Sequence, residues 1–226
     1  MTLLAEDLLL LLLDDVTGAQ TLDGTRTDLV LGGALLLELA LLGRVELTRD
    51  GPWYARERVS VADAAPLEDP LLEQAQATVA ERPRGSQDLV GRLGKGLRAR
   101  LLDRLEGRGV LERRSDRVLG LFPRTRWPAA DSAHEDAVRA RLHDVLVVGL
   151  TPDERTAALT ALLLAVDKAH TVLPGLDGRE RRAVKARAKV VAEGAWAADA
   201  VRSAVAAMQA AVAAGTVAAT TAASSG

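Results

Sequence analysis

The most suggestive spacing of chemically active residues lies around Gly94 and Gly96. Arg92 and Lys95 stand beside these glycines, immediately before the helix that the following leucines predict. Backbone N–H groups at a helix N-terminus attract phosphate, and neighbouring glycines let an anion approach closely. The segment is not a nucleotide-binding P-loop, because Leu89 replaces its first glycine and Gly96 replaces its magnesium-binding Ser or Thr. The spacing therefore predicts that this segment contacts a phosphate group, although it does not form a P-loop.

Arg98 is the third candidate for this contact. In a helical projection of residues 96–106, Arg98 falls inside the apolar stripe instead of opposite it. The stripe consists of Leu97, Leu101, Leu102 and Leu105. A long cation on such a face must pair with a carboxylate, extend to solvent or line a polar pocket. Two interpretations stay open: Lys95 and Arg98 form a phosphate site, or Arg98 pairs with Glu38, the one charge in an apolar helix.

Catalytic and metal-binding patterns are absent from the sequence. The chain has no cysteine, which excludes disulfides, iron–sulfur clusters, cysteine-ligated zinc and thiol catalysis. Its histidines have no zinc-binding spacing, and no Gly-x-Ser-x-Gly segment marks a nucleophile. The acidic pairs Glu6–Asp7 and Asp14–Asp15 are interpreted as solvated residues at helix ends. We therefore expect no catalytic residue, no metal and no cofactor, and a protein that is not an enzyme.

The net charge of −2 conceals a strong asymmetry along the chain. Residues 1–81 carry 5 basic and 15 acidic side chains, whereas residues 82–127 carry 13 basic and 5 acidic ones. The basic segment either docks on the acidic one within a single fold or faces an anionic partner, such as phospholipid headgroups or nucleic acid. Aromatic residues make up only 2% of the chain, which argues against stacking platforms for single-stranded nucleic acid.

Apolar periodicity and turn residues predict a mainly α-helical protein, with a single compact helical domain and two short β-hairpins. The expected helices cover residues 3–14, 27–42, 69–81, 87–93, 96–106, 131–146, 151–170, 178–192 and 196–214. The expected hairpins pair residues 44–47 with 58–61 and 110–113 with 117–122. The domain is expected to span residues 1–213, followed by a disordered tail at 214–226. No apolar run approaches the ~20 residues of a membrane span, so we expect a cytoplasmic protein.

Several of these segments occur in the order and spacing of one known family. They are Leu3–Leu11, Gly33–Val45, Asp69–Leu72 and Arg98–Leu111, with Ala192–Trp196 nearer the end. In these segments the chain resembles the Golgi phosphoprotein 3 family, in its bacterial branch, over about residues 2–213. The resemblance implies one mainly helical domain with β-hairpins.

Eukaryotic members of that family are peripheral Golgi proteins that bind phosphatidylinositol 4-phosphate in a shallow basic pocket. The pocket consists of a tryptophan and three arginines. The resemblance places two of these arginines on Lys95 and Arg98, the third on Gly32 and the tryptophan near Asp23. Arg26 is close enough along the chain to replace the missing cation.

The leading hypothesis is a peripheral membrane protein that binds anionic phospholipid headgroups resembling phosphatidylinositol 4-phosphate. Lys95 and Arg98 would contact the phosphate, supported by Arg92 and Arg26, at the inner face of the membrane. The resemblance also implies a homo-oligomer formed through the hairpin at about residues 109–122, and the sequence names no protein partner. Two alternatives stay open. One is a winged-helix-like nucleic-acid binder, which the overall acidity disfavours, and the other is a protein–protein scaffold without lipid binding.

Overall fold

The computed structural model describes residues 2–14, 17–48, 58–118 and 122–194, together with Ala206 and Ala210. For residues 116–118 and 122–124 it describes the backbone alone. Most of the expected helix at 196–214 and all of the expected tail at 214–226 therefore lie outside the described residues. Ala206 and Ala210 are helical and exposed.

Within the described residues, the chain forms eight α-helices, one π-helical turn and two antiparallel two-stranded sheets. The helices are α1 (Leu4–Leu11), α2 (Gly24–Leu41), α3 (Pro70–Ala80), α4 (Ser86–Gly94), α5 (Leu97–Gly107), α6 (Ala133–His143), α7 (Glu154–Ala165) and α8 (Gly178–Glu193). The π-helical turn η1 (Asp144–Val148) continues α6. The strands are β1 (Val45–Thr48), β2 (Arg58–Val61), β3 (Arg114–Val118) and β4 (Phe122–Arg126). The predicted mainly helical class with two short hairpins is confirmed.

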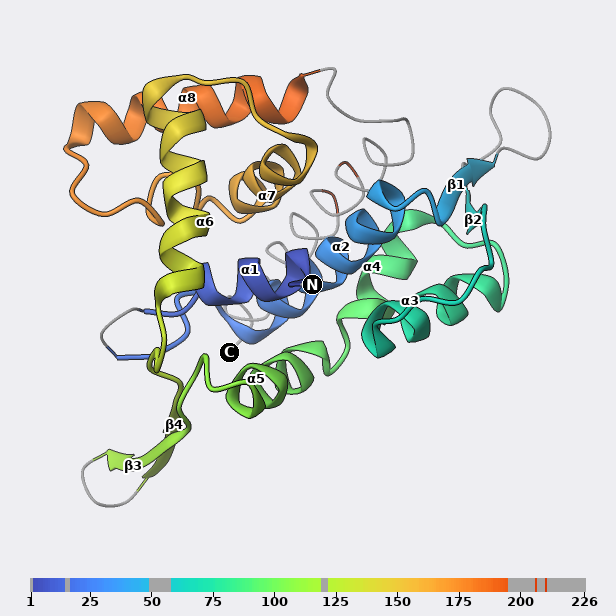
Figure 1. Ribbon diagram of the computed structural model, residues 1–226, viewed down its shortest axis with the longest axis horizontal. Helices are drawn as coiled ribbons and strands as arrows, with labels where there is room; N and C mark the ends of the chain where they lie inside the picture. The colour runs from blue at the N-terminus through green and yellow to red at the C-terminus, as the bar shows by residue number, and fades with distance from the viewer. Residues whose placement is uncertain are drawn as a thin grey trace, which may run out of the picture.

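Helices α1 and α2 form the centre of the molecule. Every residue of α1 is buried, and α2 is buried continuously from Val30 to Ala40. Both sequences are apolar on nearly every side, which is the pattern of a helix enclosed by others. Figure 1 shows α6, α7 and α8 on one side of this pair and α3, α4 and α5 on the other. No helix among the described residues is long and apolar enough to cross a membrane.

Aspartate side chains fix the starts of four helices. Asp23, Asp69, Asp153 and Asp177 each accept a hydrogen bond from a backbone N–H in the first turn of the helix that follows. Such caps satisfy donors that have no partner inside the helix. The cap at Asp23 explains why α2 begins at Gly24, three residues earlier than the apolar pattern predicts.

The first hairpin agrees with the sequence prediction, and the second does not. Strands β1 and β2 pair with Val45 opposite Val61, as the alternating pattern predicts. The second hairpin pairs β3 with β4, so it spans residues 114–126 and lies beyond the expected strand at 110–113. Leu111 is 3% exposed and belongs to the core, which keeps that segment against the body of the protein. The hairpin itself projects from the body in Figure 1.

Two glycines let α2 and α4 cross at very close range. A Cβ atom on Gly32 would lie 2.1 Å from the carbonyl oxygen of Val90. A Cβ atom on Gly94 would lie 2.0 Å from the carbonyl oxygen of Asp28. No side chain fits at either distance, so this crossing requires glycine at both positions. The crossing fixes the end of α4 against the core, one residue before Lys95.

Candidate functional site

Lys95 lies in a tight turn that joins α4 to α5. It is the residue after Gly94, has an extended backbone and is exposed to solvent. Gly96 follows with φ of +70°, a left-handed conformation that glycine adopts at little cost. No side chain caps the N-terminus of α5. The turn therefore presents the Lys95 ammonium group beside a helix end whose backbone donors point outward.

A shallow pocket of about 70 Å³ opens beside this turn. Its lining consists of Leu35, Leu71, Gln74, Ala75, Thr78, Arg92, Leu93, Lys95 and Arg100. Pockets for whole small molecules usually measure ~300–1,000 Å³, and one water occupies ~30 Å³ of liquid. This pocket therefore has room for one small polar group and not for a complete ligand.

The charge of this pocket is positive. Among the described residues, Lys95 and Arg100 have no ion-pair partner, and both are exposed. Arg92 donates from Nε to Asp88 Oδ2 at 2.9 Å, and this hydrogen bond and the aspartate charge raise the pKa of Arg92. The lining contains three cations and no carboxylate. An anionic group is therefore the complementary occupant.

Arg98 does not belong to the lining of this pocket. It is half-buried, and its guanidinium donates to the Oε1 atom of Gln20. Its charge also acts on Asp28: burial raises the pKa of that carboxyl, and Arg98 opposes part of the rise. The alternative in which Arg98 pairs with Glu38 is wrong, because Glu38 has a different partner.

Arg26 likewise lies outside the lining of the pocket. It occupies the first turn of α2, where its backbone N–H donates to Asp23 Oδ1 at 2.9 Å. Lys185 and, more weakly, His170 and Arg26 lower the pKa of Asp167, which follows α7. Of the four residues that the sequence predicts for the site, the structure thus brings Lys95 and Arg92 together and adds Arg100. Arg98, in the first turn of α5, and Arg26 do not line this pocket.

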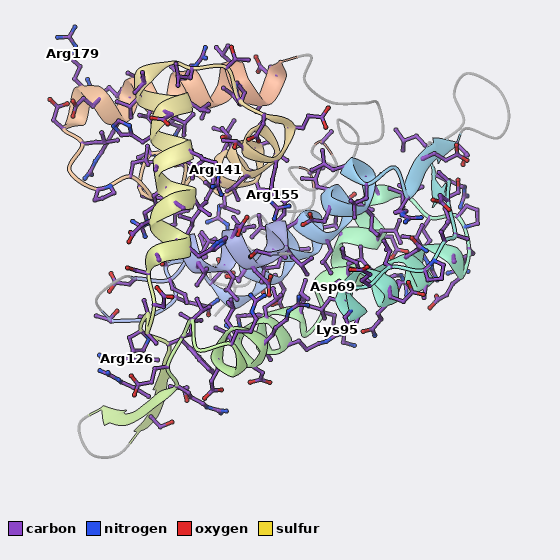
Figure 2. The ribbon with its side chains drawn as sticks, in the orientation of Figure 1. Asp69, Lys95, Arg126, Arg141, Arg155 and Arg179 are labelled. Carbon is purple, nitrogen blue, oxygen red and sulfur yellow. The ribbon has the colours of Figure 1, made fainter. Side chains whose placement is uncertain are left out.

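Glu38 pairs with Arg155 in a network of buried charges that the sequence analysis missed. Arg155 Nη1 donates to Glu38 Oε1 at 2.6 Å, and Nη2 donates to Asp7 Oδ2 at 3.1 Å. Figure 2 shows Arg155 near the centre of the molecule. Burial raises the pKa of Glu38, although the Arg155 charge and the Leu4 N–H oppose this rise. For Arg155, burial acts to lower the pKa, but the attraction of Glu38 and Asp7 outweighs it and the pKa is raised.

A second part of the network joins α5 to α1. Arg104 and Arg108 both contact Glu6 Oε1, at 2.9 and 2.8 Å, and Arg104 also donates to Asp69. Glu6 and Asp7 are 0% and 2% exposed, so the expectation that they are solvated helix ends is wrong. The available signal was the sequence of α1, which has no polar face and must therefore be enclosed with its carboxylates. Each carboxylate is paired, as buried charges must be, so removing one partner would leave a buried charge uncompensated.

A larger cavity, of about 400 Å³, lies near Glu38, Glu68, Asp69 and Arg104. Leucine and proline side chains complete its lining. Three carboxylates against one arginine make this cavity unsuited to an anion. The pocket beside Lys95 is therefore the better anion site of the two.

The comparison with known proteins agrees with the resemblance seen in the sequence. The family model of Golgi phosphoprotein 3 (GPP34) matches residues 4–208. No curated protein matches this chain. The matched range contains helices α1 to α8 and the pocket beside Lys95. The chain therefore belongs to the Golgi phosphoprotein 3 (GPP34) family.

Proposed function

We propose that this protein is a peripheral membrane protein that binds anionic phospholipid headgroups, of the phosphatidylinositol 4-phosphate type, at the turn between α4 and α5. The observation that carries the proposal is the pair of exposed cations, Lys95 and Arg100, that lack an ion-pair partner among the described residues. They flank a pocket lined by donors. Family membership gives independent support.

The pocket suits binding without catalysis. Its polar lining consists of Gln74, Thr78, Arg92, Lys95 and Arg100. Lysine and arginine form charge-assisted hydrogen bonds with phosphate oxygens, and these bonds are stronger than neutral ones. The lining contains neither histidine nor a carboxylate that would act as a general base. We accordingly propose that the protein is not an enzyme and acts by associating with the inner face of a membrane.

The test compares vesicles containing phosphatidylinositol 4-phosphate with vesicles of equal charge containing phosphatidylglycerol. We expect the wild type to prefer the former in a flotation assay. The double variant Lys95→Glu with Arg100→Glu should lose this preference. Each lost charge-assisted contact costs about 1.5–3 kcal/mol, so affinity for the phosphoinositide vesicles should fall at least about a hundredfold.

The matched control keeps the charge and changes only the side chains, as Lys95→Arg with Arg100→Lys. It should retain the preference, because both positions still carry cations that form charge-assisted hydrogen bonds with phosphate. A separate Arg98→Glu variant tests the residue that the sequence predicts but the pocket does not include. If the wild type has no preference for the phosphoinositide, the proposal fails. Steeply salt-dependent binding to duplex DNA would then favour the nucleic-acid alternative, and binding to neither would favour the scaffold.

A further inference from the structure

A second cationic surface lies on α8, far from Lys95. This helix carries six basic residues and two acidic ones. Lys185 contacts Asp167 at 2.7 Å and Lys189 contacts Glu193 at 3.9 Å. The three arginines near the start of the helix are exposed and have no ion-pair partner among the described residues; they are Arg179, Arg181 and Arg182.

These three arginines are not placed where they would stabilise α8. Cations near a helix N-terminus are unfavourable, because the macrodipole places partial positive charge there. The helix instead begins with a capping box, in which Asp177 accepts from Glu180 N at 2.8 Å and Glu180 accepts from Asp177 N at 2.7 Å. The acidic side chains thus stabilise the helix start, and the arginine charges remain available to a partner.

Exposed apolar side chains lie in the segment that follows α6, which consists of η1 and the next two residues (144–150) and which we call the apolar turn. This turn lies beside α8. Of the five most exposed large apolar residues among those described, three belong to this turn and one to α8. They are Val147, Val148, Leu150 and Val190, with exposed fractions of 40%, 60%, 53% and 60%. Soluble proteins expose single apolar residues routinely, but consecutive ones beside a basic helix suggest an interaction surface.

Arg187 holds the turn against α8. Its guanidinium donates to the carbonyl oxygens of Val145, Gly149 and Leu150 at 3.1–3.3 Å. Val190 follows Arg187 by three residues, so the two side chains are neighbours on the helix. The apolar turn therefore has a fixed position next to the exposed part of α8.

Two of the three arginines and Val190 share one side of the helix. The buried side of α8 consists of Val184, Ala188 and Val191. In a helical projection, Arg179, Arg182 and Val190 all lie on the opposite side. Together with the neighbouring turn residues they form what we call the α8 surface, defined by Arg179, Arg182, Val190, Val148 and Leu150.

We propose that the α8 surface is a separate contact site for an anionic lipid bilayer. Arginines that attract anionic headgroups, beside aliphatic side chains that enter the acyl boundary, are the features of interfacial membrane binding. An acidic protein segment is the less suitable partner, because it offers no apolar contact to the exposed aliphatic side chains, which the acyl boundary of a bilayer accepts. Figure 2 shows Arg179 and Lys95 on opposite sides of the molecule, so the α8 surface is distinct from the proposed headgroup site.

The experiment measures binding to vesicles of phosphatidylcholine and phosphatidylglycerol over a range of salt concentrations. Reversing the charges in Arg179→Glu with Arg182→Glu should lower affinity by about thirtyfold or more and flatten the salt dependence. Replacing the apolar residues in Val148→Ser with Leu150→Ser should lower affinity by about tenfold and leave the salt dependence unchanged. The control, Arg179→Lys with Arg182→Lys, should bind as the wild type does. Circular dichroism and thermal melting verify that each variant is folded.

Different results would overturn the headgroup site and the α8 surface. The Lys95→Glu with Arg100→Glu variant should lose its preference for phosphatidylinositol 4-phosphate and still bind the phosphatidylglycerol vesicles through the α8 surface. The inference is overturned if the charge reversal on α8 leaves phosphatidylglycerol binding unchanged, or if the wild type does not bind these vesicles. In the second case, binding of polyglutamate that the α8 reversal abolishes would assign the surface to an acidic protein.

Discussion

Arg155 and Lys95 are both cationic, but their surroundings give them different roles. Arg155 contacts two buried carboxylates, Asp7 and Glu38, so its charge is neutralised inside the protein. Removing one partner from a buried ion pair costs about 3–5 kcal/mol, because the other charge stays buried alone. Lys95 has no such partner among the described residues and is exposed. A variant of Lys95 therefore tests binding without disturbing the fold, whereas a variant of Arg155 does not.

Asp69 provides a pH-dependent part of the stability. Burial acts to raise the pKa of this carboxyl, but hydrogen bonds from Arg104 and Leu71 N and the arginine charge outweigh it, and the pKa is lowered. A lowered carboxyl pKa contributes stability above the ordinary value of ~3.9, and the contribution is lost as pH falls through the folded-state value. Asp69→Asn keeps the helix cap but loses the ion pair. We expect this variant to be about 1.5 kcal/mol less stable than the wild type at neutral pH.

Urea denaturation at a series of pH values measures this difference. The two unfolding free energies should begin to converge as pH falls below about 4. They should meet once pH has fallen through the lowered pKa of Asp69 in the folded protein, where its carboxylate becomes protonated. A difference that stays constant down to pH 2 would show that the loss arises from something other than the charge of Asp69.

At the scale of elements, the crossing of α2 and α4 depends on glycine. Gly94→Ala should destabilise the protein by about 1–3 kcal/mol, because the new methyl group would overlap the Asp28 carbonyl oxygen. Gly91→Ala is the matched control in the same helix, since no atom lies within 4 Å of its added Cβ. The control should be neutral or stabilise by up to ~1 kcal/mol, because alanine favours helix. The denaturation midpoints of the two variants measure these changes in stability. Equal stability of Gly94→Ala and Gly91→Ala would contradict a tight crossing.

The same crossing leaves no room for the cation that the resemblance implies at position 32. The resemblance places one pocket arginine on Gly32, and here that position is buried against the Val90 carbonyl oxygen. An arginine has no room there in this chain. The pocket beside Lys95 has Arg100, from α5, in its lining. The sequence alone did not single out Arg100, because its place beside Lys95 depends on which side of α5 faces the turn.

Local sequence patterns predicted the positions of helices and strands better than they predicted which strands pair and which charged side chains meet. The apolar sequences of α1 and α2 and the alternation in β1 and β2 were sufficient to place these elements. The second hairpin was misplaced because Leu111 packs into the core, which local alternation does not reveal. The partner of Glu38 was also wrong, because Arg155 is 117 residues away along the chain. Ion-pair partners at such separations follow from the tertiary fold, which no local pattern reports.

At the scale of the whole molecule, the structure neutralises part of the charge asymmetry and leaves other cations of the basic segment exposed. Arg104 and Arg108, from the basic segment, pair with Glu6 in the acidic one, so part of the asymmetry is neutralised inside the fold. Lys95 and Arg100 keep their charge at the surface. Exposed cations on a molecule with net charge −2 make any encounter with an anionic surface dependent on orientation.

The placement of Lys95 and Arg179 on opposite sides of the molecule has a consequence for adhesion. One flat bilayer cannot touch both surfaces at once, so a molecule bound through one keeps the other free to capture a second bilayer. The wild type should therefore crosslink vesicles that contain phosphatidylinositol 4-phosphate and phosphatidylglycerol, which light scattering detects as clustering. Either double charge reversal, at Lys95 and Arg100 or at Arg179 and Arg182, should bind these vesicles without clustering them.

Crosslinking by a two-sided molecule also has a characteristic dependence on dose. Scattering should rise with protein concentration, pass through a maximum and fall again once every vesicle is coated and no free bilayer remains to be captured. Clustering that persists in both charge-reversal variants would instead show that the vesicles are joined by another part of the protein, such as the β3–β4 hairpin.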